Sequence, residues 1–316
     1  MKNVAFAAVL LLTVSVSARH VFYNSLDVID DYVQAVAQAH PHKVKAIEIG
    51  RSVENRSLTV LQIGNSGPAV WIDAGIHARE WISVAVALDF VNRLVEQPFG
   101  ANVTFYVLPV VNPDGYRYSM IKAGTFLAQK PPQSMRKRDS LLPRPQNTVI
   151  EPTDDNSCSL AAAGAHSFSE PETIAIWSFL TNRPIRLFIS LHSFGQLFLL
   201  PRDVTAEHPA YQLALKAAEA LEAVHGTKYD VGTSQELLDS SAGGLSKDWA
   251  YERLGVNYSY TLELRPSAPR REFVKFCGNS FECGFLLDPK EILPTAEETW
   301  KALKVMVKQI SAEFKQ

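Results

Sequence analysis

The chain has little net charge and few cysteines, and it lacks the short motifs of several enzyme classes. Its 31 basic and 33 acidic residues leave a formal charge of −2, so electrostatics gives no reason to expect nucleic acid or an anionic membrane as a partner. The absence of H-E-x-x-H, G-x-S-x-G and a glycine-rich phosphate loop argues against three common catalytic classes. What remains is a globular sequence of 316 residues, 47% hydrophobic, without internal repeats and long enough for one large domain.

Long apolar runs are also scarce, and the one that stands out lies at the amino terminus. It spans Val4 to Val14 behind a single lysine and precedes small residues that end at Ala18. This layout is typical of a secretory signal, so we predict that residues 1–18 are removed and that the protein is extracellular. The alternative is a membrane anchor, but the run is short for a span and no stop-transfer flank follows it. Three sequons agree with passage through the secretory pathway: Asn55, Asn102 and Asn257.

The three cysteines leave one without a partner in an expected extracellular chain. Cys277 and Cys283 are close enough in the sequence to pair with each other. Cys158 then has no evident partner.

Apolar periodicity alternates between the helical and the strand type along the chain. Helices are predicted at residues 24–40, 81–97, 169–180, 208–225 and 294–310. Strands are predicted at residues 58–64, 69–75, 103–111, 187–193, 196–201 and 259–265. Two helices are expected to start with capping boxes, Ser169-x-x-Glu172 and Thr295-x-x-Glu298. This alternation predicts one α/β domain with a largely buried sheet.

The stretch GIHAREW places His77 and Glu80 three positions apart, directly after a predicted buried strand. A catalytic zinc site needs three protein ligands and leaves the fourth position to water. His192 is the best third candidate, because it also stands at the end of an apolar strand, where open α/β sheets place their sites. A His-x-x-Glu pair also arises by chance, so the alternative is an ordinary polar loop. We predict that these three residues bind one zinc ion per chain.

Glu263 lies inside the run YSYTLELRP, which is otherwise typical of a buried strand. A charge in such a place is costly unless it is paired or functional. A glutamate that faces a zinc-bound water can take its proton and deliver it to a leaving amine. The alternative is a glutamate on the solvent side of an edge strand. The segment alone leaves both interpretations open.

Six segments, in order, resemble the zinc metallocarboxypeptidases of the pancreatic carboxypeptidase A/B type. They are GIHAREWIS, VNPDGYRYS, SFSEPET, SLHSFGQLFLLP, TLELR and GFLLDPKEILPTAEETW. The likeness runs from about Leu26 to the carboxyl end, and the ordered set is far more specific than any single motif. The resemblance implies a single α/β domain with a mixed, eight-stranded sheet between helices.

The resemblance also implies roles for individual residues. The three ligand candidates match the zinc ligands of the family, and Glu263 matches its general base. Arg79 and Arg136 match residues that contact the substrate carboxylate and polarise the scissile carbonyl, a role that suits a fixed cation. Lys247 matches the base of the specificity pocket, where a buried ammonium favours an acidic terminal side chain. The alternative for Lys247 is a lysine on a helix surface.

The sequence departs from the family at the substrate clamp and at the substrate cap. Relatives carry an Asn-Arg-Asn-Trp segment that clamps the terminal carboxylate, and here DSLLPRPQNTVIEPTDDN stands in its place. That segment usually also holds the partner of the cysteine that matches Cys158. Arg138 or Arg144 is the candidate to replace the missing clamp arginine in binding the terminal carboxylate. Ser240, or a neighbour, stands where relatives have a mobile tyrosine.

We therefore expect residues 19–316 to form a secreted zinc carboxypeptidase domain with no room for a prodomain. Its partners are predicted to be peptide or protein carboxyl termini, with a preference for acidic residues, and neither nucleic acid nor membrane. The chain is expected to be a monomer. One alternative is a catalytically impaired homologue that binds zinc and peptides without cutting them. Another is an imperfect translation that lacks an exon after Arg136.

Overall fold

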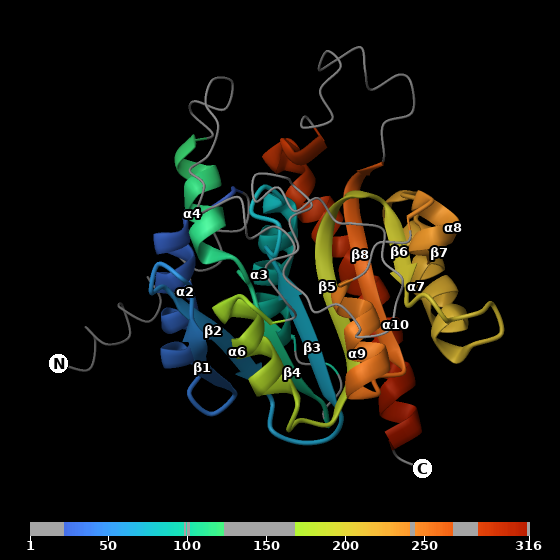
Figure 1. Cartoon of the computed structure of the whole chain (residues 1–316), viewed down its shortest axis with the longest axis horizontal. Coiled ribbons are helices and arrows are strands. Elements are labelled where there is room, and N and C mark those ends of the chain that lie inside the picture. Colours follow the sequence, from blue (N-terminus) through green and yellow to red (C-terminus); the bar gives the residue numbers. More distant parts are fainter. Residues whose placement is uncertain are drawn as a thin grey trace.

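An eight-stranded mixed sheet lies between two layers of helices (Figure 1). This computed structural model describes residues 22–97, 99, 102–122, 168–240, 244–267 and 284–314. The strands are β1 (Val44–Arg51), β2 (Ser57–Ile63), β3 (Ala69–Ala74), β4 (Thr104–Leu108), β5 (Ile185–Gly195), β6 (Leu197–Leu200), β7 (Asp230–Thr233) and β8 (Tyr258–Ser267). Their order across the sheet is β1-β2-β4-β3-β5-β8-β6-β7. The prediction of a single α/β domain with a mixed sheet is confirmed.

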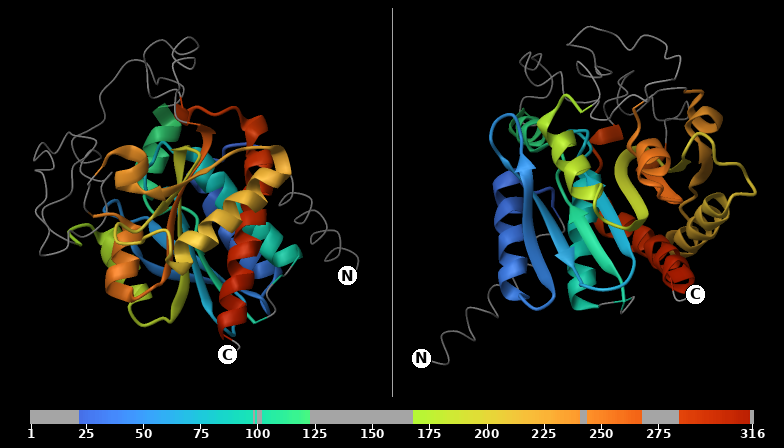
Figure 2. Two further views of the ribbon diagram at one scale, coloured as in Figure 1. Left: turned by 90° about the vertical axis from the view of Figure 1, so that its right-hand side faces the viewer. Right: turned by 60° about the horizontal axis from the view of Figure 1, so that its bottom comes forward.

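The helices of the described residues lie before, between and after these strands. They are α2 (Leu26–Ala39), α3 (Trp81–Glu96), α4 (Pro113–Lys122), α6 (Pro171–Leu180), α7 (Pro209–His225), α8 (Ser234–Leu238), α9 (Ser246–Leu254) and α10 (Ile292–Phe314). Figure 2 shows α7 and α10 side by side on one face of the sheet. None of the described helices is long and apolar enough to cross a membrane.

Alternating residues of the central strands face two separate hydrophobic clusters. On β3, Val70 and Ile72 belong to the larger cluster, which includes residues of α2, α3, α7 and α10. Trp71, between them, belongs to the smaller cluster with α6 and α9. Because successive side chains of a strand point to opposite faces, Asp73 lies on the same face as Trp71. Ser190, His192 and Glu263 lie on this α6/α9 face as well, since Asp73 pairs with Ser190 and His192 with Glu263.

The three central parallel strands bring distant segments of the chain to one edge. β3 pairs in parallel with β5, and β5 with β8. Parallel strands end at the same edge of a sheet, so residues that follow β3 meet residues near the ends of β5 and β8. β8 lies between β5 and β6 and is not an edge strand. The alternative for Glu263, an edge-strand residue facing solvent, is therefore wrong.

Most predicted elements are present, but both predicted capping boxes are wrong. The N-cap of α6 is Glu170, not Ser169, and it makes no side-chain cap. Thr295 lies inside α10, which begins at Ile292. The structure also contains elements that the sequence did not predict: β1, β7, α4, α8 and α9.

Candidate active site

The loop between β3 and α3 carries two of the predicted ligands. Gly75 begins this loop with a φ of 66°, and an added Cβ would lie 2.9 Å from Cγ2 of Val84. Glycine reaches this left-handed conformation without steric cost, which explains the turn at this position. Glu80 is the N-cap of α3, and its amide nitrogen donates to the carbonyl oxygen of His77. The turn thus aims both side chains at the sheet edge, and the helix N-terminus favours the carboxylate.

The motif VNPDGYRYS supports this loop from behind. Its first two residues end the loop between β4 and α4, and the rest form the first part of α4. The backbone nitrogen of Asn112 donates to the carbonyl oxygen of Gly75. A Cβ added to Gly115 would lie 2.9 Å from Cβ of Ala78, so only a glycine lets α4 approach the loop this closely. Ser119 Oγ accepts from Trp81 Nε1 at 2.9 Å and lies 2.8 Å from the carbonyl oxygen of Ala78. The loop is therefore held in a fixed shape.

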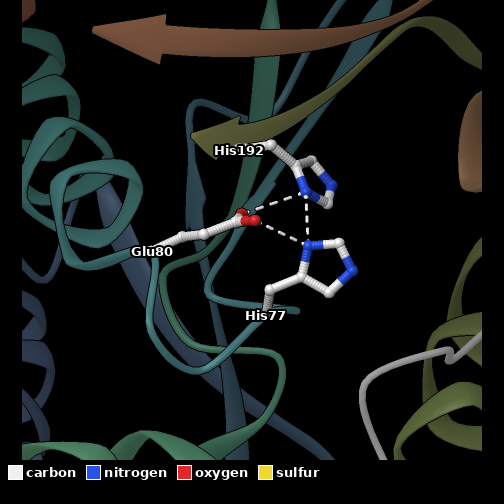
Figure 3. A group of neighbouring side chains, drawn as sticks. All are labelled: His77, Glu80 and His192. Carbon is white, nitrogen blue, oxygen red and sulfur yellow. Dashed lines mark hydrogen bonds and ion pairs between the residues drawn. The ribbon is translucent and has the colours of Figure 1, made fainter. Parts of the chain in front are cut away.

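His77, Glu80 and His192 converge at the sheet edge, as the sequence predicted (Figure 3). Nδ1 of His77 lies 2.7 Å from Oε1 of Glu80, and Nδ1 of His192 lies 3.1 Å from Oε2. The two Nδ1 atoms are 3.1 Å apart. One potential ligand atom from each residue falls within a group no wider than 4.8 Å. Two imidazole nitrogens and a carboxylate are a donor set that zinc prefers, and their convergence fits such an ion.

The electrostatics of this group favour a bound cation. Burial alone raises the pKa of Glu80, but the charges of His77 and His192 lower it to about 2. Burial alone lowers the pKa of His192, but Glu80 raises it to about 9. Glu80 and His192 are buried, at 4% and 6% exposure. The carboxylate therefore remains ionised, as a metal ligand must be, and His192 releases its extra proton when a metal ion binds.

Glu263 lies beside the ligand group on the neighbouring strand. Its Cα pairs with that of His192 in the parallel register of β5 and β8, so both side chains lie on the same face of the sheet. Burial, followed by the negative charge of Glu80, raises the pKa of Glu263 to about 7, against the opposing effect of both histidines. A carboxyl group with a pKa near neutrality can both accept and return a proton at physiological pH.

Arg79, which lies between two of the ligand residues in the sequence, packs against an aromatic pair. Its guanidinium carbon lies 4.2 Å from the centroid of the Phe285 ring, and Phe285 packs edge-on against Phe194. Arg79 retains partial exposure, so this cation–π contact fixes its side chain and leaves the guanidinium accessible. Arg136, the other predicted arginine, lies outside the described residues.

Lys247 is buried at the start of α9 instead of lying on a helix surface. Its side chain is 1% exposed, and its Nζ lies 3.0 Å from Oδ1 of Asp248. Burial lowers the pKa of Lys247, and Asp248 opposes that effect. Asp248 also accepts from the backbone amide of Arg202. The ammonium of Lys247 is thus buried and already paired with its neighbour.

Several sequence predictions fall on residues that the structure does not describe. These are residues 1–18, the segment that replaces the clamp, and all three cysteines. Ser240, at the expected position of the capping tyrosine, is described, and its amide donates to the carbonyl oxygen of Ser234. Sequence reasoning missed Asp73 and Ser190, which contact the ligand group from behind. The available signal was strand periodicity: Asp73 follows Trp71 by two residues, and Ser190 precedes His192 by two residues, so each pair shares a face of its predicted strand.

Comparisons with known proteins indicate one family. The family model described as zinc carboxypeptidase matches residues 29–302. Carboxypeptidase B of Astacus astacus is 33% identical over 311 residues, covering 90% of this chain and 95% of that protein. Carboxypeptidase A2 of Mus musculus is 33% identical over 316 residues, covering 91% of this chain and 70% of that protein.

Solved structures show the same similarity. Bovine thrombin-activatable fibrinolysis inhibitor, in complex with tick carboxypeptidase inhibitor, superimposes with a TM-score of 0.79 and 32% identity, covering 93% of this chain and 99% of that chain. Carboxypeptidase A from Helicoverpa armigera superimposes with a TM-score of 0.77 and 25% identity. The match covers 99% of this chain and 82% of that chain. With a family model spanning most of its length and relatives aligned over about nine-tenths of it, the chain belongs to the zinc carboxypeptidase family.

Proposed function

We propose that this metallocarboxypeptidase is secreted and removes single residues from peptide carboxyl termini, with a preference for acidic residues. The convergence of His77, Glu80 and His192 beside Glu263 is the observation that carries the proposed site. Zinc bound by these three residues would polarise the scissile carbonyl and activate a water for attack.

The protein residues perform the remaining steps. Glu263 accepts a proton from the attacking water and delivers it to the leaving amine, which its raised pKa allows. Arg79, held by Phe285, offers a cation to the carboxylate end of the substrate. We assign to Arg136 the stabilisation of the oxyanion, on the resemblance of its segment to the family.

Mass spectrometry tests the activity. The purified, zinc-loaded protein is incubated with peptides ending in Glu, Asp, Phe, Leu, Lys or Arg. We expect loss of single carboxyl-terminal residues, abolished by a chelator and restored by added zinc. If zinc remains bound and no peptide is shortened, the catalytically impaired homologue is the correct interpretation. Cleavage away from the carboxyl terminus would contradict the proposal directly.

Secretion is supported by the amino-terminal apolar run and by the exposure of all three sequon asparagines. We expect a eukaryotic secretory host to release the protein into the medium with Arg19 as its first residue, carrying glycans at one or more sequons. Intact-mass analysis before and after deglycosylation, with sequencing of the amino-terminal peptide, measures both. Retention in the cell with residues 1–18 still attached would contradict this expectation.

A further inference from the structure

A serine and an aspartate connect one zinc ligand to the interior of the sheet. Nε2 of His192 lies 3.0 Å from Oγ of Ser190, and that hydroxyl donates to Oδ1 of Asp73 at 2.5 Å. The other carboxylate oxygen of Asp73 accepts from Nε1 of Trp71 at 2.5 Å. Ser190 and Asp73 are 0% and 1% exposed. The contacts thus form a continuous chain from Trp71 to the ligand group, on the side of His192 that faces away from Glu80.

The strand register builds this arrangement. Asp73 on β3 pairs directly with Ser190 on β5, and His192 follows two residues later on the same face. Asp73 itself follows Trp71 by two residues on its own strand. Directly paired residues of adjacent strands hold their side chains close together. The backbone therefore fixes the distance between carboxylate, hydroxyl and imidazole without help from a loop.

The hydrogen atoms in this series of hydrogen bonds can be placed by counting donors and acceptors. Ionised Asp73 is only an acceptor, and the indole nitrogen is only a donor. The single hydroxyl proton of Ser190 goes to Asp73, so the hydroxyl oxygen must accept from His192. Nε2 of His192 then carries a hydrogen, and in the neutral ring that a metal ion requires the lone pair is on Nδ1. Nδ1 is the atom that faces Glu80 and His77.

We propose that Asp73 and Ser190 are positioning residues that hold His192 in the tautomer and the orientation needed to bind zinc through Nδ1. Ligating histidines commonly donate their second N–H to a carboxylate. Here the carboxylate acts through one intervening hydroxyl, because Asp73 lies opposite Ser190 and not opposite His192. The negative charge of the buried carboxylate polarises the hydroxyl, and the hydroxyl in turn polarises the N–H of the imidazole. This makes Nδ1 a stronger electron-pair donor to the metal.

Zinc affinity of matched variants tests the proposal. Ser190→Ala removes the hydroxyl, Asp73→Asn removes the charge, and Ser190→Thr keeps a hydroxyl. Ser259→Ala is the control, because Ser259 is also a fully buried strand serine, and its hydroxyl donates to the backbone carbonyl of Lys247 at 2.8 Å. Chelator competition should show zinc binding weakened about 10- to 100-fold by Ser190→Ala and Asp73→Asn. Ser190→Thr should recover most of the affinity, and Ser259→Ala should stay within about twofold of wild type.

Equal zinc affinity in Ser190→Ala and in wild type would overturn the proposal, because the hydroxyl would then serve only the packing of the sheet. NMR of histidine-labelled, zinc-loaded wild-type protein provides a second test that needs no variant. A proton on Nε2 of His192 with Nδ1 bound to the metal is expected, and metal bound to Nε2 would overturn the proposal. The inference rests on the zinc site of the proposed function, but both tests measure metal binding. A protein that binds zinc and cuts no peptide would therefore leave it intact.

Discussion

Replacing Glu263 with glutamine is expected to reduce kcat roughly 10²- to 10⁴-fold and to leave zinc bound, since general acid–base catalysis contributes about that factor. The amide keeps the size of the side chain but can no longer accept the proton of the attacking water. Glu263 lies opposite His192 in the strand register and is not one of the three converging ligands. Stopped assays on a peptide with a single cleavable residue measure kcat, and metal analysis after dialysis measures zinc.

The matched control is Glu219→Gln, because Glu219 is an exposed glutamate on α7 and belongs to neither hydrophobic cluster. Its kcat should equal that of wild type. Two results would contradict the role of Glu263. Unchanged kcat would mean that another group moves the proton, and parallel loss of zinc and activity would make Glu263 part of the metal site.

The ligand group could be predicted because its signals are local and repeated. His77 and Glu80 follow a strand with a glycine directly after it, and His192 lies near the end of a second strand. The strand order that brings these ends together was not readable from periodicity, and the family resemblance implied only a mixed, eight-stranded sheet; the order comes from the structure. Glu263 shows the limit of the local pattern, since only its central position between β5 and β6 decides between a solvent face and the site.

The capping boxes failed because both glutamates have partners elsewhere in the fold. Oε1 of Glu172 accepts from the backbone amide of Val53, 119 residues away in the sequence. Glu298, which is fully buried, forms an ion pair with the half-buried Arg265 of β8. A Ser/Thr-x-x-Glu pattern looks the same whether its glutamate caps a helix or anchors a distant strand. The missed strands β1 and β7 likewise depend on pairing partners for their stability.

The charges around Lys247 determine how the proposed preference for acidic residues can work. Asp248 pairs with Lys247, and it also lies 3.6 Å from Nη2 of Arg202. Arg202 in turn pairs with Glu252 at 3.2 Å. Two cations and two anions give this cluster no net charge. An acidic terminal side chain must therefore share Lys247 with Asp248, so the attraction between the ammonium and the substrate depends on how strongly Asp248 holds it.

Replacing Lys247 with methionine is expected to lower kcat/KM for peptides ending in Glu relative to those ending in Leu by at least about tenfold. Truncating one member of a buried charge pair costs about 2–5 kcal/mol, and sharing with Asp248 reduces the part felt by the substrate. Asp248→Asn should shift the same ratio in the opposite direction, because the ammonium then lacks its internal partner. Competition between the two peptides in one reaction measures the ratio directly.

The two variants together separate selection from stability. Lys216→Met, at an exposed lysine of α7, is the control and should leave the ratio unchanged. A structural role for Lys247 predicts that Lys247→Met lowers the free energy of unfolding, since Asp248 is left buried without that partner, and that the Glu-to-Leu ratio stays constant. Opposite shifts of the ratio in Lys247→Met and Asp248→Asn require instead that the ammonium meets the substrate, because packing alone gives the two changes no reason to differ in sign.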